Sequence, residues 1–229
     1  MVEDQRNFTW LSCGLAFVGG YSDAASFILA QTFTGHVTGN FVLTAVSLAS
    51  QDWLTFLRRI LAIALFLMGI VLSVILERWL TRKPSGSFLP GVLGLEIILI
   101  YLAYAVLTSA LAARLVLFVI CMALALGLQN GAWREAGGIT VHSTYLTGMI
   151  TNLVTTGTQR YLAKTAREAW ADIKISLLSG IWLAFVAGAT LGAALVFRFG
   201  APGILGTALV LLTLLLRQSL VILRGKGTQ

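Results

Sequence analysis

Long, uninterrupted runs of apolar residues constrain this chain more than any other feature. Residues 60–76, 115–133 and 175–197 form three such runs that contain no charged side chain. A membrane-spanning helix needs about 20 predominantly apolar residues, because the hydrocarbon core of a bilayer is about 30 Å thick. The runs lack the alternation of apolar and polar residues that is typical of barrel strands. The sequence therefore predicts an all-α fold, a polytopic bundle of transmembrane helices.

Composition supports the membrane assignment. Hydrophobic residues make up 58% of the 229 residues, charged residues 11%, and the mean hydropathy is +0.89. Soluble domains are about one-quarter charged. The net charge is +7, but the Lys and Arg residues lie between the apolar runs, which indicates loop charges that set orientation and no nucleic-acid partner. Cys13 and Cys121 lie inside apolar runs and are expected to be small buried thiols. The acidic start of the chain favours a retained first helix over a cleaved signal peptide.

We expect eight helical elements in a single integral membrane domain that covers residues 1–229. The expected elements are residues 8–30, 33–50, 60–76, 91–113, 115–133, 140–158, 175–197 and 204–223. Two of them, 33–50 and 140–158, are rich in Thr and Gly and less apolar than the others. The sequence leaves open whether these two cross the membrane or re-enter it, so six to eight helices cross.

The elements also form two weak internal repeats. A shift of 107 residues places Gly20 and Asp23 on Gly127 and Asn130. Eight crossings would make the repeats parallel, and six would make them inverted. The first repeat is expected at about 8–80 plus 91–113, and the second at about 115–197 plus 204–223.

Loop charges predict the orientation but not the number of crossings. Apart from Arg217, which lies within an apolar element, the Lys and Arg residues divide ten to five with eight crossings and eleven to four with six crossings. Both patterns follow the positive-inside rule. We therefore expect a multi-pass protein of the inner (plasma) membrane with both termini in the cytoplasm.

Polar clusters in the apolar chain are the candidate functional sites, because polar groups inside a membrane are costly. Asp23 is the only acid between Asp4 and Asp52. It is expected to couple to a proton or cation, or to pair with a cationic group of a substrate; the alternative is an aspartate that caps a helix end near the interface. The candidate substrate- or ion-binding residues are Asp23, Ser22, Thr34, His36, Thr38, Asn40, Gln129, Asn130, Thr147 and Asn152, with His142 and Thr151 in the second cluster.

The same clusters are also compatible with a packing role. Gly35 and Gly39 form a GxxxG pattern that would let another backbone approach closely. A single histidine without a nearby cysteine does not predict a metal site. Glu96 and Arg217 are expected to snorkel to the interface, and Arg134 and Glu135 to form an interfacial pair. No motif of a known enzyme class is present, so we expect no catalytic residue and no cofactor.

Two motifs carry a resemblance to a known family. The residues G-x-x-D-A at 20–24 and F-T-G-H-V-T-G-N at 33–40 resemble the YoaK-like family of small bacterial membrane proteins, as do G-L-Q-N-G-A at 127–132 and T-Y-L-T-G-M-I-T-N at 144–152. The resemblance covers about residues 8–223. It implies a polytopic inner-membrane protein, sometimes described as a predicted permease, and it implies no established ligand residues.

These observations favour a small-solute secondary transporter or channel, proton-coupled through Asp23. The alternative is a non-transporting membrane protein, an assembly, sensing or lipid-interacting module, whose polar clusters serve helix packing. An intramembrane enzyme that acts on lipid is a third reading with less support. The expected partners are membrane lipid, an unidentified small solute and a second copy of the chain, since about 230 residues are few for alternating access.

Overall fold

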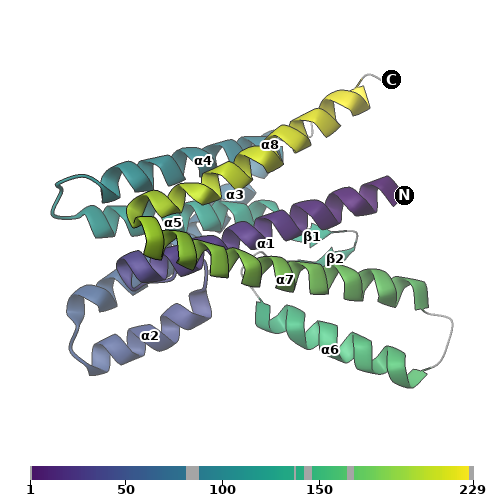
Figure 1. Cartoon of the computed structure of the whole chain (residues 1–229), viewed down its shortest axis with the longest axis horizontal. Helices are drawn as coiled ribbons and strands as arrows, with labels where there is room; N and C mark the ends of the chain where they lie inside the picture. The colour runs from purple at the N-terminus through teal and green to yellow at the C-terminus, as the bar shows by residue number, and fades with distance from the viewer. Residues whose placement is uncertain (1, 81–87, 137, 142–145, 164–167, 227–229) are drawn as a thin grey trace.

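The computed structural model describes residues 2–80, 88–136, 138–141, 146–163 and 168–226 (Figure 1). Within these residues the fold is a helix bundle with one short β-hairpin, which confirms the predicted all-α class. The elements are α1 (Val2–Ala30), α2 (Val37–Ala49), α3 (Trp53–Leu80), α4 (Phe88–Leu107), α5 (Arg114–Ala132), β1 (Glu135–Ala136), β2 (Ile139–Thr140), α6 (Leu146–Ala163), α7 (Glu168–Phe199), a 3-10 turn (Ala201–Ile204) and α8 (Leu205–Lys226).

Six of the described helices are long and apolar enough to cross a membrane, namely α1, α3, α4, α5, α7 and α8. They lie side by side along the long axis of the molecule (Figure 1). Helix α2 has 13 residues, which gives a length of about 20 Å against a hydrocarbon thickness of about 30 Å. Helix α6 does not meet the same criteria of length and composition. The structure thus favours six crossings, with α2 and α6 as the two elements that do not span.

Helices α1 and α5 run in opposite directions. The indole Nε1 of Trp133, just after α5, donates to Ser12 Oγ at 2.9 Å, and Gln129 Nε2 donates to the Leu15 carbonyl at 3.1 Å. Residue numbers therefore rise along α1 as they fall along α5. In two parallel repeats that begin with α1 and α5, these two helices would run in the same direction.

Two further pairs of helices pack closely and in parallel. Helix α1 packs against α7, where a Cβ atom at Gly188 would overlap the Phe17 carbonyl and one at Gly192 would lie 2.7 Å from the Tyr21 carbonyl oxygen. Helix α3 packs against α5 in the same way, since a Cβ at Gly69 would lie 2.7 Å from the Leu124 carbonyl oxygen. Gly188 and Gly192 thus let the backbones of α1 and α7 approach closely.

The relation of the two halves follows from these directions. Helix α1 contacts α7, the third helix of the second half, and α5 contacts α3, the third helix of the first half. The first helix of each half thus packs against the third helix of the other half. Because α1 and α5 are antiparallel, this arrangement favours inverted over parallel repeats; the repeats themselves stay a prediction. Both termini lie at the same end of the bundle, as an even number of crossings requires (Figure 1).

Several expected boundaries are wrong. Helix α3 begins at Trp53, so that Arg58 and Arg59 belong to the helix and not to a loop. Asp52 caps this helix: its Oδ1 accepts the Thr55 N–H at 3.1 Å, and hydrogen bonds from the Thr55 hydroxyl and N–H lower the pKa of Asp52. Helix α6 runs from Leu146 to Ala163 and α7 from Glu168 to Phe199, against the expected bounds 140–158 and 175–197.

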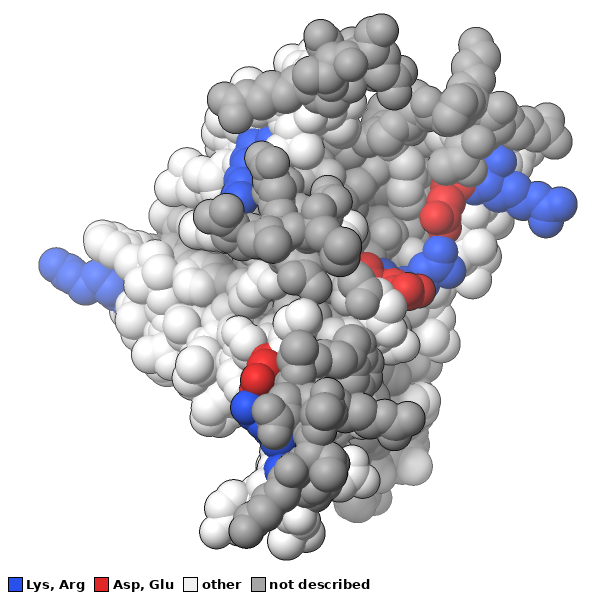
Figure 2. All heavy atoms as spheres, turned by 90° about the vertical axis from the view of Figure 1, so that its right-hand side faces the viewer, with Lys and Arg blue, Asp and Glu red and all other residues white. Residues whose placement is uncertain are grey.

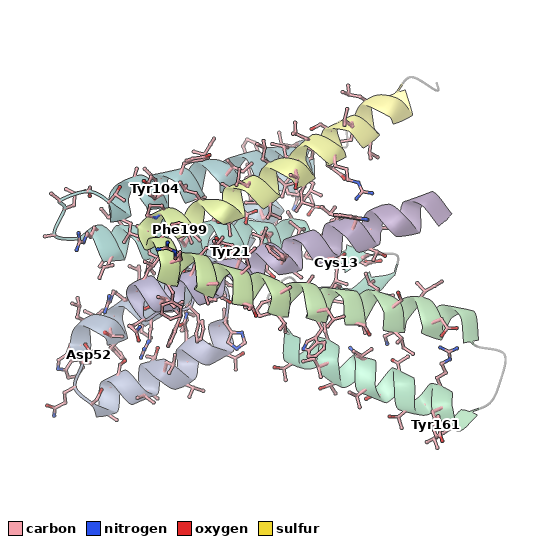
Figure 3. All side chains as sticks on the ribbon, viewed as in Figure 1. Cys13, Tyr21, Asp52, Tyr104, Tyr161 and Phe199 are labelled. Atoms are coloured by element: carbon pink, nitrogen blue, oxygen red, sulfur yellow. The ribbon has the colours of Figure 1, made fainter. Side chains whose placement is uncertain are left out.

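The second half contains a β-hairpin after α5 where the first half has an irregular loop. Strand β1 pairs antiparallel with β2, and Gly138 between them adopts φ 81°. Ala136 and Ile139 of the hairpin pack with residues of α1, α6 and α7 in a small apolar cluster. The main core lies between α1, α3, α4, α5 and α8. Tyr21 points from α1 toward the start of α8 and donates its hydroxyl to the Gly203 carbonyl (Figure 3).

Candidate functional site

The chain turns back on itself after α1. Helix α1 ends at Ala30, and Gln31 takes a left-handed conformation with φ 53°. The loop then runs back beside α1, because the backbone N–H groups of Thr34 and Gly35 donate to Asp23 Oδ1 at 2.9 and 2.7 Å. Asp23 lies seven residues before the helix end, about 10 Å along its axis. We call residues 31–49, the loop and α2 together, the turn-back segment.

The amide side chain of Asn40 and the hydroxyl of Thr34 fix the loop of the turn-back segment. Asn40 Oδ1 accepts the Phe33 N–H at 3.1 Å and its Nδ2 donates to the Phe33 carbonyl at 2.6 Å, so both backbone groups of one residue are paired. Thr34 Oγ1 bonds Ser26 Oγ at 3.1 Å. Buried backbone groups away from regular structure need such partners. The Asn of the T-G-N motif therefore serves the conformation of the loop.

Arg59 connects the turn-back segment to α3. Its guanidinium donates to the Gln31 carbonyl from Nε at 3.2 Å and from Nη2 at 3.0 Å, and Nη1 donates to the Leu43 carbonyl at 2.5 Å and to Ser47 Oγ. Only 7% of Arg59 is exposed. Because Leu43 and Ser47 lie on α2, one side chain joins the end of α1, α2 and α3. Sequence reasoning missed this residue, which it treated as a loop charge.

An aromatic stack lies at the tip of the loop. The rings of Phe27 and Phe33 stack with centroids 4.7 Å apart, and the His36 ring meets Phe33 edge-on at 5.6 Å. A Cβ atom at Gly39 would meet the His36 and Phe33 rings. The expectation that the GxxxG pattern admits another helix is thus wrong at Gly39, because the rings of its own loop occupy that space.

A pocket of about 230 Å³ lies between α1, the loop and α7. Its lining comes from helix α1, the loop and helix α7, which meet only in the folded chain. The lining residues are Gly20, Asp23, Ala24, Phe33, His36, Phe185 and Ala189. Asp23 and His36, both predicted site residues, are therefore brought together, while Phe185 and Ala189 carry no signal in the sequence that would have identified them.

Asp23 has one oxygen engaged and one without a partner. Oδ1 accepts the two loop N–H groups, whereas Oδ2 is buried and has no hydrogen-bond partner in the described part of the chain. The neighbouring Ser22 hydroxyl is also buried and unpartnered there. An unpaired buried oxygen is costly. The residue that carries this buried oxygen also lines the pocket.

The remaining predicted residues separate into two groups. Thr34 lies beside Asp23 in the loop, and Asn40 lies on α2, from which it bonds the loop at Phe33. Thr38 is exposed on α2, and His36 precedes that helix. Gln129 and Asn130 are buried in α5, where they donate to the Leu15 and Leu126 carbonyls, the latter at 2.9 Å. The other three residues of the second cluster, Thr147, Thr151 and Asn152, are exposed on α6; His142 lies outside the described residues.

Two expectations about charged residues are wrong. Glu96 does not snorkel: it is fully buried in α4, and neither carboxyl oxygen has a hydrogen-bond partner among the described residues. Arg134 bonds Glu77 of α3 at 2.5 Å and not its neighbour Glu135. A second ion pair joins Arg160 and Asp172. At the end of the bundle that carries the termini, acidic side chains lie beside basic ones (Figure 2).

Comparison with known proteins agrees with the helical membrane fold. A family described as a protein of unknown function, DUF1275, matches residues 11–217. The chain is 23% identical over 144 residues to the UPF0700 transmembrane protein YoaK of Bacillus subtilis (strain 168), a match that covers 63% of this chain and 62% of the relative. It thus spans less than two thirds of that relative. No solved structure matches. The resemblance to the YoaK-like family is confirmed, and the chain belongs to the DUF1275 family of multi-pass membrane proteins.

Proposed function

We propose that this protein is a secondary transporter for a small solute and that Asp23 couples transport to a proton. The observation that supports the proposal most strongly is the divided carboxylate of Asp23, a residue that lines the pocket: Oδ1 is bound to the loop, and Oδ2 is buried without a hydrogen-bond partner among the described residues. Polar and ionisable groups inside membrane helices commonly mark substrate and ion pathways.

The two oxygens link occupancy of the pocket to the position of the loop. An ionised carboxylate accepts hydrogen bonds more strongly than a neutral carboxyl group. A proton on Oδ2 would therefore weaken the hold of Oδ1 on the Thr34 and Gly35 N–H groups. The turn-back segment would then change its equilibrium between two positions, as a coupled transporter requires. No residue has a catalytic role in this proposal.

The opposed arrangement of the two halves also supports transport. Inverted repeats with interrupted helices near the membrane midplane are common in secondary transporters. Here the first half has α2 and the second has α6 as elements that do not span, and in Figure 1 the two lie toward opposite ends of the bundle.

A packing role is the second candidate, and a specific observation favours it. Asp23, Asn40 and Arg59 all bond the backbone of the turn-back segment. Residues with that arrangement stabilise a fold whether or not a solute passes. The protein would then be an assembly, sensing or lipid-interacting module.

Proteoliposomes that contain a pH-sensitive dye separate the two candidates. Wild type is compared with Asp23→Asn over a panel of small solutes, since the Asn carbonyl oxygen keeps an acceptor for the two N–H groups. The control is Asp52→Asn, which makes the same change at the cap of α3, outside the pocket. We expect a solute-dependent proton flux in wild type and in the control, and none in a folded Asp23→Asn. Wild-type flux in Asp23→Asn would refute coupling through Asp23, and loss of stability without any flux in wild type would favour the packing role.

A further inference from the structure

We propose that the pocket beside Asp23 binds a small organic ammonium ion. The inference rests on the proposed function in one respect, because it names the substrate class for that transport. Binding itself can be tested without it. Three properties of the pocket carry the inference: its single unpaired carboxylate oxygen, its aromatic walls and its volume.

The charge of the pocket selects a cation. Asp23 is 3% exposed, and its Oδ2 has no partner among the described residues. None of the residues that line the pocket is Lys or Arg. A bound anion would face the Asp23 carboxylate, and His36 is the other ionisable residue of the lining. A cation would instead satisfy a buried oxygen that otherwise costs free energy.

The walls select an organic cation over a metal ion. Phe33 and Phe185 line the pocket from the loop and from α7. Aromatic faces attract alkylammonium groups by cation–π interaction. Hard metal cations require about six oxygen ligands, and the described residues contain no group of three His, Cys, Asp or Glu side chains that could hold a metal. A site with one carboxylate and apolar walls does not replace the hydration shell of such an ion.

The Phe33 wall is held in place before any ligand arrives. Its ring stacks on Phe27 at 4.7 Å and meets His36 at 5.6 Å, while Asn40 bonds both of its backbone groups. Preorganised walls reduce the cost of ordering side chains on binding. The volume of about 230 Å³ lies below the range of about 300–1,000 Å³ that is typical of drug-sized ligands. The pocket therefore suits an ammonium group with a few carbon substituents.

Equilibrium binding of tetramethylammonium to the purified full-length protein tests the inference, and tert-butanol serves as an uncharged probe of similar size. Wild type is expected to bind the cation saturably and at least about ten-fold more tightly than the alcohol. Asp23→Asn is expected to lose about ten-fold in affinity for the cation. Ala189→Phe should abolish binding by filling the pocket, and the control Ala187→Phe, at an exposed position of the same helix, should bind as wild type.

Three results would overturn the inference: equal affinity for cation and alcohol, wild-type affinity in Asp23→Asn or Ala189→Phe, or no saturable binding to folded wild type. Failure of the proposed function gives a different pattern. Cation binding without any solute-driven flux leaves the ligand assignment standing and refutes transport. Flux of another solute class without cation binding refutes the ligand assignment and leaves transport standing.

Discussion

Arg59 gives the sharpest test of the turn-back segment, through the substitution Arg59→Met. The arginine makes four hydrogen bonds to Gln31, Leu43 and Ser47, which lie in the loop after α1 and on α2. A hydrogen bond to a charged group contributes about 1.5–3 kcal/mol, and an unsatisfied buried acceptor costs about 1–3 kcal/mol. The net loss is smaller than the sum of these terms, because methionine fills much of the space and the substitution removes a buried charge. We expect a loss of about 2–4 kcal/mol in the free energy of unfolding, because the Gln31, Leu43 and Ser47 acceptors lose their donor.

The assay is SDS-induced unfolding in mixed micelles, with Arg58→Met as the matched control. Arg58 is the neighbouring residue in α3 and, within the described part of the chain, donates only to Thr55 Oγ1, one turn away at 2.8 Å. Its loss should therefore cost less than about 1 kcal/mol. Arg59→Lys should not restore stability, because one ammonium group cannot reproduce the forked contacts to the loop and to α2. If the free energies of unfolding of Arg59→Met and Arg58→Met agree within about 0.5 kcal/mol, the Arg59 side chain does not stabilise the turn-back segment.

Three further predictions concern groups outside the pocket. Glu96→Leu should raise the thermal stability, because an apolar side chain replaces a fully buried carboxyl group that has no hydrogen-bond partner among the described residues; lower stability would show that this carboxyl group stabilises the fold. Gly69→Leu should disrupt the contact of α3 with the Leu124 carbonyl and lower the yield of folded protein, whereas Gly91→Leu, where a Cβ meets no atom of the described residues within 4 Å, should not. Asp52→Asn should remove part of the acid sensitivity of unfolding. The lowered pKa of Asp52 means that its stabilisation is present above the ordinary aspartate pKa and is lost as pH falls through the lower folded value; equal loss of stability down to about pH 3 in both proteins would contradict this assignment.

The spanning helices could be predicted because their signal is local. Runs such as 60–76 and 175–197 are long enough to cross a bilayer by themselves, and no packing partner is needed to identify them. Asp23 could be selected as a candidate for the same reason, since a lone acid in an apolar helix is visible without a structure. The end of α1 at Ala30 also follows the change from apolar to polar residues at Gln31.

Other features depend on contacts between distant residues and leave no local pattern. Arg59 lies after a polar turn like an ordinary topology-setting charge, but its acceptors are carbonyls 16 and 28 residues earlier in the chain. Phe185 enters the pocket from α7, far along the chain from Asp23. Glu96 lies near the start of its apolar run, so its position predicts that the side chain reaches the membrane interface. In the structure it is buried in the core. In each case tertiary packing decides the environment of a charged or aromatic side chain.

The central claim, that the pocket beside Asp23 is part of a solute path, is tested most directly by thiol accessibility at Ala189. The variant Ala189→Cys is made in a protein whose two native cysteines, Cys13 and Cys121, have been replaced. A membrane-impermeant thiol reagent is then applied to proteoliposomes from one side at a time, with Ala187→Cys as an exposed control on the same helix. We predict that Ala189→Cys reacts from both sides and that Asp23→Asn shifts the reaction toward one side, while Ala187→Cys, facing lipid, stays unreacted. A folded Ala189→Cys protein that reacts from neither side, or from a single side regardless of Asp23, would contradict a path through this pocket.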